Sequence, residues 1–345
     1  MEIIITVQDV VGTKVNWKCG HTSSPEFPRG VTAPVVYGPG IKALGLGRYN
    51  VCQTSVGNVT DFLSGFMNPS VSEGTVLAWS KKLGENLDVW DQSMRELVKN
   101  SPVVYADETP IRVSGVANAH LHVAATEQIT LFHIAGRSKN DIAAGGIVSG
   151  YEGTLVTDCL PSYWSLSAGT HQACIAHLIR ECRGRNDDSA PHNPNTPHPY
   201  PEFAALVELF QTTIHQTHEQ GLVTAPVEQT RTLCLGGLDK LGKVPKSKTK
   251  QVATALLRRV LRLLDAGDLY RFTQDELVNP TNNESERALR GAKIKQKRSG
   301  TYRSLPYARS YVRVSSYLDT ARKNGVNPTV ALKLALEGNP YTPTT

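Results

Sequence analysis

The stretch Pro102-Val103-Val104-Tyr105-Ala106-Asp107 is apolar until its last residue, which is a carboxylate. The stretch Thr154-Leu155-Val156-Thr157-Asp158 ends in the same way. Short runs of this kind predict buried strands. An aspartate at the end of one strand is most often a turn or helix cap. Two such strands in one sheet, however, would bring Asp107 and Asp158 to a common site.

A third acidic residue belongs to the segment 280–287, Pro-Thr-Asn-Asn-Glu-Ser-Glu-Arg, which opens a helical, basic stretch. Glu284 and Glu286 are two positions apart, so on a helix they point about 200° away from each other. Thr281 and Glu284 have the spacing of a capping box, which leaves Glu286 free for a site. Asn283 is also a good cap, and this permits the reverse assignment. The residues alone leave the two glutamates nearly tied.

Three converging carboxylates raise one another's pKa and destabilise the fold unless cations neutralise them. Carboxylate oxygens are the ligands that Mg²⁺ prefers, and two such ions can clamp the attacking and leaving oxygens of a phosphoryl transfer. The pattern therefore predicts a two-metal site that contains Asp107, Asp158 and one of the two glutamates.

Basic residues gather after the third acid. The formal net charge is only +6, but residues 287–323 hold eleven Lys and Arg against one acid, Asp319. This asymmetry indicates a polyanionic partner, most commonly nucleic acid, whereas the alternative is a solvated helix face. The residues predicted to contact DNA are Arg287, Arg290, Lys293, Lys295, Lys297 and Arg298.

The remaining composition excludes other classes of protein. A chain of 345 residues predicts two or three structural units. Its six scattered cysteines are typical of reduced thiols in a cytosolic protein rather than of a disulfide scaffold. Because the sequence contains neither an apolar run of about 18 residues nor a recognisable signal peptide, we expect no membrane span and a cytoplasmic protein.

The period of the apolar residues changes along the chain. Residues 1–34 look irregular, and Cys19 with His21 falls short of the four ligands of a zinc site. Residues 35–100 read as helical, with Ser72 as a helix cap. The two helices on either side of Asn68-Pro69 predict a helix-turn-helix or, equally well, a structural helical hairpin.

Strand patterns then begin and end. We expect strands at 103–105, 119–124, 129–134, 154–157 and 171–174, with a helix at 139–147. In the second strand Leu121 and Val123 would face away from His120 and His122. These elements predict a mixed α/β sheet with Asp107 on its first strand and Asp158 on its fourth. Residues 185–201 read as a loop, and only helical patterns follow from about 202 to 268.

Four segments that occur in one order carry a family resemblance: residues 105–109, 156–158, 173–181 and 280–287. Together with residues 31–39 and 316–325, they resemble the transposases of the insertion-sequence 66 family over roughly residues 25–330. The resemblance implies a ribonuclease-H-like catalytic domain whose Asp-Asp-Glu triad binds two Mg²⁺ or Mn²⁺ ions. Carried over by motif, the triad is Asp107, Asp158 and Glu286, which breaks the tie with Glu284.

The resemblance also implies a function and partners. It implies cleavage of DNA at the ends of a mobile element and strand transfer into target DNA, by a homo-oligomer in the bacterial cytoplasm, associated with the nucleoid. A nuclease without strand transfer is one alternative. A catalytically inactive, DNA-binding remnant is another, because the upstream zinc-binding segment of the relatives is shortened here to Cys19-Gly20.

The motif Cys174-x-x-His177 is similar to one that accompanies helical insertions in other transposases. Three roles stay open for it: metal binding together with a fourth ligand, a buried motif that joins the core to the insertion, and DNA contact. His171 lies one helical turn earlier on the same predicted helix face. We do not expect a structural zinc ion.

The resemblance implies six segments along the chain. They are an irregular remnant of a zinc-binding segment at 1–34, a helical domain at 35–100, the first part of the catalytic core at 101–184, a helical insertion at 185–278, the catalytic helix with the basic part of the core at 279–325, and a tail at 326–345.

Overall fold

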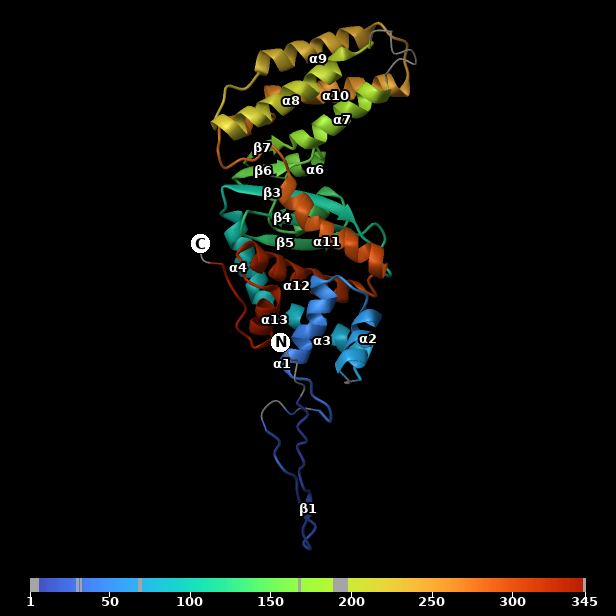
Figure 1. Ribbon diagram of the computed structural model, residues 1–345, viewed down its shortest axis with the longest axis vertical. Helices are drawn as coiled ribbons and strands as arrows, with labels where there is room; N and C mark the ends of the chain where they lie inside the picture. The colour runs from blue at the N-terminus through green and yellow to red at the C-terminus, as the bar shows by residue number, and fades with distance from the viewer. Residues whose placement is uncertain are drawn as a thin grey trace.

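The computed structural model describes residues 6–28, 31, 33–67, 70–166, 169–188 and 198–343. Figure 1 shows an elongated molecule in which a mixed sheet lies between two groups of helices. At one end a short hairpin, β1 (Val15–Asn16) and β2 (Thr22–Ser23), extends away from the body. At the other end lie four helices that follow the last strand.

The central sheet has five strands in the order β5-β4-β3-β6-β7. Their bounds are β3 (Val103–Pro110), β4 (His120–Ala125), β5 (Thr130–Ala135), β6 (Thr154–Thr157) and β7 (Thr170–Ala173). The first three form an antiparallel meander, while β6 pairs with β3 in parallel and β7 pairs with β6 in parallel. The predicted mixed α/β sheet is confirmed.

One predicted strand end is wrong. β3 does not stop at Asp107 but continues to Pro110, because β4 keeps pairing with it: Thr109 lies opposite Leu121 and Pro110 opposite His120. The parallel partner β6 does stop, and its last pairing with β3 joins Val156 to Tyr105. Asp107 therefore pairs with β4 on one side and has no partner strand on the other among the described residues. The predicted helix at 139–147 also ends earlier, as α5 (Lys139–Ala144).

Both faces of the sheet are covered by apolar packing. Leu121 and Val123 of β4 point to the face crossed by α11 (Asn283–Ser299), as their alternation with His120 and His122 predicts. The opposite face receives Met94 of α4 (Asp88–Lys99). Here α5 and the short helix α6 (Pro161–Trp164) complete the layer.

A second long helix, α12 (Leu305–Lys323), closes the edge of the sheet at β5. The hydroxyl of Ser316 accepts the backbone N–H of Phe132 at 2.9 Å, and that of Thr320 accepts the N–H of Thr130 at 3.1 Å. These side chains replace the missing neighbouring strand. The covered edge is thereby prevented from pairing with another chain.

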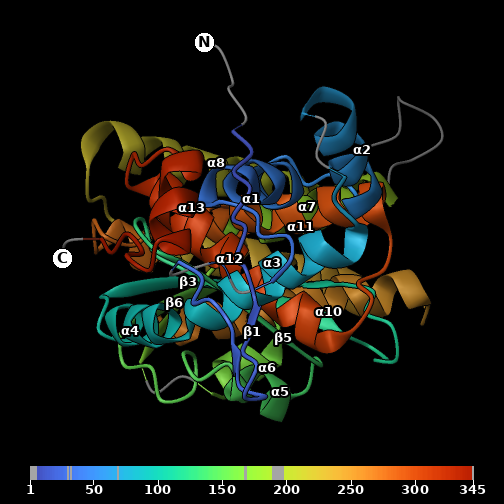
Figure 2. The same ribbon diagram turned by 90° about the horizontal axis from the view of Figure 1, so that it is seen from below.

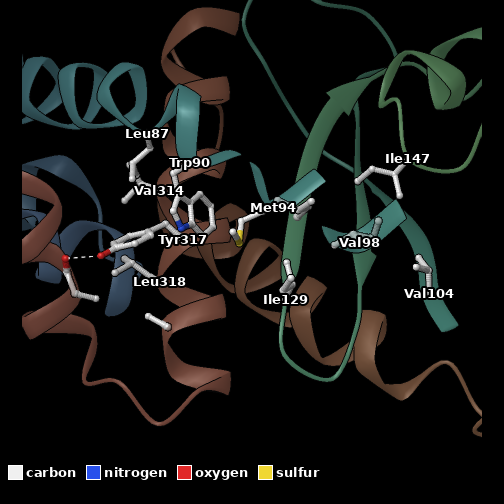
Figure 3. Packing of buried hydrophobic residues seen from close by; sticks show 14 of the residues in the cluster. Leu87, Trp90, Met94, Val98, Val104, Ile129, Ile147, Val314, Tyr317 and Leu318 are labelled. Atoms are coloured by element: carbon white, nitrogen blue, oxygen red, sulfur yellow. Dashed lines mark hydrogen bonds between the residues drawn. The ribbon is translucent and has the colours of Figure 1, made fainter. Parts of the chain in front are cut away.

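Aromatic side chains join α4, α12 and the C-terminal segment (Figure 3). Trp90 packs edge-on against Tyr317, with ring centroids 5.1 Å apart. The Tyr317 hydroxyl donates to the carbonyl of Ala331 in α13 (Pro328–Leu336) at 2.8 Å and accepts the N–H of Tyr341. The indole N–H of Trp90 donates to the carbonyl of Tyr341 at 2.8 Å, so the polar ring atoms of both Trp90 and Tyr317 have partners, as burial requires.

The N-terminal helices gather around α12 and α13, and Figure 2 shows them from below. They are α1 (Pro39–Leu46), η1 (Gly47–Val51), α2 (Val56–Met67) and α3 (Glu73–Asn86). Helix α3 packs against α12, α1 packs against α13, and α2 packs against α3. Ser72 caps α3 by accepting the N–H of Thr75, as predicted. A Cβ atom on Gly84 would lie 2.6 Å from the Cα of Ser310, so α3 and α12 touch backbone to backbone. This packing favours the structural hairpin over the helix-turn-helix. Asn68-Pro69 lies outside the described residues.

The four helices at the far end are α7 (Ile175–Asp188), α8 (Pro201–Gln220), α9 (Val227–Gly242) and α10 (Lys248–Asp265). Phe203, Phe210, Cys234 and Leu257 lie in their common core. The helical patterns predicted after 202 are confirmed, whereas the predicted loop at 185–201 overlaps the end of α7 and includes residues 189–197, which lie outside the description. A short turn of 3-10 helix, η2 (Arg271–Thr273), leads back toward α11.

Candidate active site

The register of β3 and β6 determines how the two aspartates lie. Tyr105 is opposite Val156 in the parallel pair, and Asp107 and Asp158 each follow two residues later. Since side chains two apart in a strand share a face, both carboxylates point to the side of the sheet that α11 crosses. Asp107 and Asp158 are therefore neighbours on adjacent chain segments at one edge of the sheet.

The electrostatics of the two aspartates agree with this placement. The pKa of Asp107 is raised to about 7, chiefly by burial and with smaller contributions from the negative charges of Asp158, Glu108 and Glu286. Burial also raises the pKa of Asp158, with a contribution from Glu108. The charges of Asp158 and Glu286 thus both affect the protonation of Asp107, which indicates that the three predicted acids belong to one site.

Glu286 is placed by the segment 279–282, which fastens the start of α11 to the sheet. The Asn279 side chain donates to the Tyr105 hydroxyl at 2.8 Å, and the Asn282 side chain donates to the carbonyl of Ala106 at 2.8 Å. These two acceptors immediately precede Asp107 on β3. Glu286 lies one helical turn after this segment, so its position is fixed relative to the strand that carries Asp107.

The same segment is also held by the junction of β7 and α7. The N–H of Ile175 donates to the carbonyl of Pro280 at 2.9 Å. The N–H of Asn282 donates to the Cys174 sulfur at 3.2 Å. Cys174 is completely buried, and burial raises the pKa of its thiol. This favours the second of the three roles left open for the motif, the buried connection between core and insertion.

The capping box expected from Thr281 and Glu284 does not form. The helix begins after Asn282 without a side-chain cap, and Glu284 instead pairs with Lys323 of α12 at 3.2 Å. A partner distant in sequence has replaced the local one. Glu286 points the other way, to α7, where Arg180 lies 2.9 Å and His177 Nδ1 lies 3.6 Å from its Oε1. The predicted divergence of the two glutamates is confirmed.

Cys174, His177 and Glu286 form a set of three ligand atoms that lie within 4.8 Å of one another, and no fourth ligand joins them among the described residues. Burial, with the nearby charge of Arg180, lowers the pKa of His177, so its contact with Glu286 joins a neutral ring to a carboxylate. His171 is elsewhere: it belongs to β7 and stacks on Trp164, with ring centroids 4.4 Å apart.

Two residues at the site had no sequence signal strong enough to single them out. Glu108 follows Asp107 on the opposite face of β3, and its buried carboxylate pairs with Arg137 at 2.9 Å. Arg180 reaches Glu286 from a different helix. The position of Glu108 next to Asp107 was visible in the sequence, whereas the contact of Arg180 depends on the fold.

The basic face of α11 holds most, but not all, of the cations expected to contact DNA. Exposed on it are Arg287, Arg290, Lys293, Lys297 and Arg298. Lys295 is different, because only 3% of it is exposed. Its ammonium donates to the carbonyl of Thr54 at 2.7 Å and lies 3.9 Å from the ring centre of Tyr49. The prediction that Lys295 contacts DNA is therefore wrong for this arrangement.

Comparison with known proteins gives the chain a family. No helix in the described residues is both long and apolar enough to pass through a membrane. No curated protein matches the chain. The family described as "Transposase IS66 family" matches residues 56–310, which is well over half of the chain and includes all three acids. The chain belongs to this family, whose members are phosphoryl-transfer enzymes of DNA transposition.

Proposed function

We propose that the chain is a metal-dependent transposase that cleaves the ends of its own element and joins them to target DNA. Asp107, Asp158 and Glu286 would be its catalytic carboxylates. The observation that carries the proposal is the register of β3 and β6, which places two aspartates side by side next to the helix that bears the third acid.

The residues present fit a site for Mg²⁺ or Mn²⁺. All three donors are carboxylates, which suit hard cations. The pKa of Asp107, raised to about 7 by burial and by its acidic neighbours, means that the site holds negative charge only at a cost. A bound cation would remove that cost. Two such ions, when bound, supply the charge that activates the attacking oxygen and stabilises the leaving oxygen.

The chain's own residues would position the DNA. The exposed cations of α11 continue along the helix from Glu286, so phosphates held by Arg287 and Arg290 would lie beside the acids. Contacts of this kind fix the register of a duplex without reading its sequence. Arg180 of α7 would neutralise the Glu286 carboxylate, 2.9 Å away, until a metal ion replaces it.

The mixed sheet and the helical unit between Asp158 and Glu286 support a ribonuclease-H-like core with an insertion. We propose the six-part division of the chain on the same basis, with the start of the insertion moved to α7. A dimer or larger assembly is expected by analogy with the family, since two element ends must be brought together.

The test is an assay with Mg²⁺, a duplex that carries the element's end, and a target plasmid. Glu286→Gln and Asp107→Asn should each abolish both cleavage and joining. Glu284→Gln is the matched control, because it lies on the same helix but points to Lys323, and it should retain activity. Full activity of Glu286→Gln would refute the assignment.

The products distinguish the alternatives. DNA joined covalently to the target indicates a transposase. Nicks without joining would indicate a nuclease, and salt-dependent DNA binding without any Mg²⁺-dependent cleavage would indicate an inactive DNA-binding protein.

A further inference from the structure

A cavity of about 130 Å³ lies on the flank of α11 that faces away from α7. It is enclosed by α11, α12 and η1 above the sheet. Its walls include Phe132 of β5, Tyr302, and Tyr311 of α12. Ordinary ligand pockets measure roughly 300 Å³ or more, so this one is suited to a single planar ring group.

One amide that lines this cavity has an oxygen without a partner. Asn50 is 5% exposed, and its Nδ2 donates to the carbonyl of Tyr311 at 3.4 Å. Its Oδ1 is buried and accepts no hydrogen bond. A buried acceptor of this kind costs free energy unless a donor reaches it. Asn50 lines the cavity, so the N–H group of a guest would supply the missing donor once the amide turns toward it.

A second amide comes from Gln53, which has a φ of +55°. This left-handed conformation is uncommon for a residue other than glycine. It brings the Gln53 side chain over α11, where a Cβ atom on Gly291 would lie 2.5 Å from Gln53 Nε2. Only the absence of a side chain at position 291 lets the amide lie so close to the helix, so two amides reach the same cavity.

Two arginines and one aspartate, Asp319, also line the cavity. Arg287 and Arg322 both line it, and their side chains are 70% and 54% exposed. Each also has a carboxylate nearby, Glu284 at 3.8 Å and Asp319 at 3.1 Å. The site thus combines aromatic walls and amides inside with guanidinium groups outside.

We propose that this cavity receives one nucleobase, turned out of the stack of the DNA that binds along α11. Aromatic walls provide a surface for a base, amides pair with base edges, and arginines at the mouth hold the flanking phosphates. Enzymes that extrude a base read it in a closed pocket of this kind. The unpaired Oδ1 of Asn50 lacks a donor, which the amino group of a base would supply, and adenine, which offers a donor beside an acceptor, matches an asparagine amide best. The inference rests on the proposed function, because it takes DNA to be the partner.

The test begins with a duplex of the element's terminal repeat in which 2-aminopurine replaces one base at a time. This base fluoresces when it is unstacked. Binding of the full-length protein should raise the fluorescence at one position and leave the neighbouring positions unchanged. A uniform response along the duplex would overturn the proposal.

The second step fills the cavity. Ala292→Leu adds bulk to its wall, and Ala78→Leu on the exposed side of α3 is the matched control. Ala292→Leu should bind the natural duplex about tenfold more weakly. An abasic site at the responsive position should restore its affinity, while the same abasic site should weaken binding by the wild type and by the control. Loss of affinity that the abasic site does not restore would count against the cavity as a base pocket.

The third step tests the amide. Asn50→Leu should bind about tenfold more weakly when adenine occupies the responsive position and should lose the preference for adenine over thymine. The outcomes are separable from those of the proposed function. If the wild type binds and cleaves the duplex but no position responds, the base pocket alone fails. If it binds no DNA at all, the proposed function fails as well.

Discussion

The Arg180 guanidinium donates to Glu286 Oε1 at 2.9 Å, so a cation from α7 neutralises the acid on α11. A divalent ion and this guanidinium would compete for one carboxylate. Arg180→Ala should therefore bind Mn²⁺ more tightly than the wild type, which calorimetry on the DNA-free protein would measure.

The fold should be little affected by this change, because the Arg180 side chain is 57% exposed and surface ion pairs contribute only about 0–1 kcal/mol. Arg183→Ala, on an exposed position of the same helix, is the control and should leave the Mn²⁺ affinity unchanged. A weaker Mn²⁺ affinity in Arg180→Ala would show that the arginine organises the site instead of competing with the ion.

Lys295 makes stability depend on pH. Burial lowers its pKa to about 7, compared with 10.5 for an exposed lysine. Between these values the folded state binds fewer protons than the unfolded chain, so the free energy of unfolding rises with pH from about 7 upward. Tyr49 does not interfere, since burial raises its pKa to about 12.

The measurement is urea unfolding at about pH 7 and about pH 9. Relative to Lys295→Met, the wild type should gain stability between these two conditions. Lys297→Met, two positions later and exposed, should follow the wild type at both. Parallel pH profiles for the wild type and Lys295→Met would contradict the lowered pKa.

Gly84 sets the distance between α3 and α12. Gly84→Ala would place a Cβ atom 2.6 Å from Ser310 Cα, and forcing the helices apart should cost about 1–3 kcal/mol of unfolding free energy. Gly65→Ala in α2 meets open space and should instead stabilise by about 0.5–1 kcal/mol, because alanine is the better helix former. Thermal unfolding of both variants gives the comparison, and equal effects would show that the close contact is not rigid.

The exposed and buried cations of α11 should differ in DNA binding. For each phosphate contact removed, the slope of log affinity against log salt should fall by about 0.9. Arg290→Ala is expected to show this decrease, whereas Lys295→Met should keep the wild-type slope because its ammonium faces Tyr49 and Thr54. The slopes come from binding titrations over a range of salt concentrations.

The strands could be predicted from the sequence because their residues form short apolar or alternating runs. Asp107 and Asp158 directly follow two of these runs. The end of β3 was misjudged, since Glu108-Thr109-Pro110 resembles a turn and only pairing with β4 makes it a strand. That pairing depends on residues distant in sequence. Local patterns cannot contain it.

The prediction that Lys295 contacts DNA failed for a different reason. This residue lies seven positions after Ala288 and three after Ala292, on the inward stripe of α11, so its burial could have been read from the helical period. The choice between Glu284 and Glu286 could not. It depends on Lys323 and Arg180, which reach α11 from two other helices.

The hydrogen bond between Ile175 and Pro280 has a consequence for how the chain can vary. The described chain leaves the core after Ile175 and is back beside β7 from Asp268, whose carbonyl accepts the N–H of Ala173, to Pro280. The length and content of the part that leaves the core add no distance between Asp158 and Glu286. Helices α8, α9 and α10 could be lengthened, shortened or exchanged over generations while the three acids keep their mutual positions.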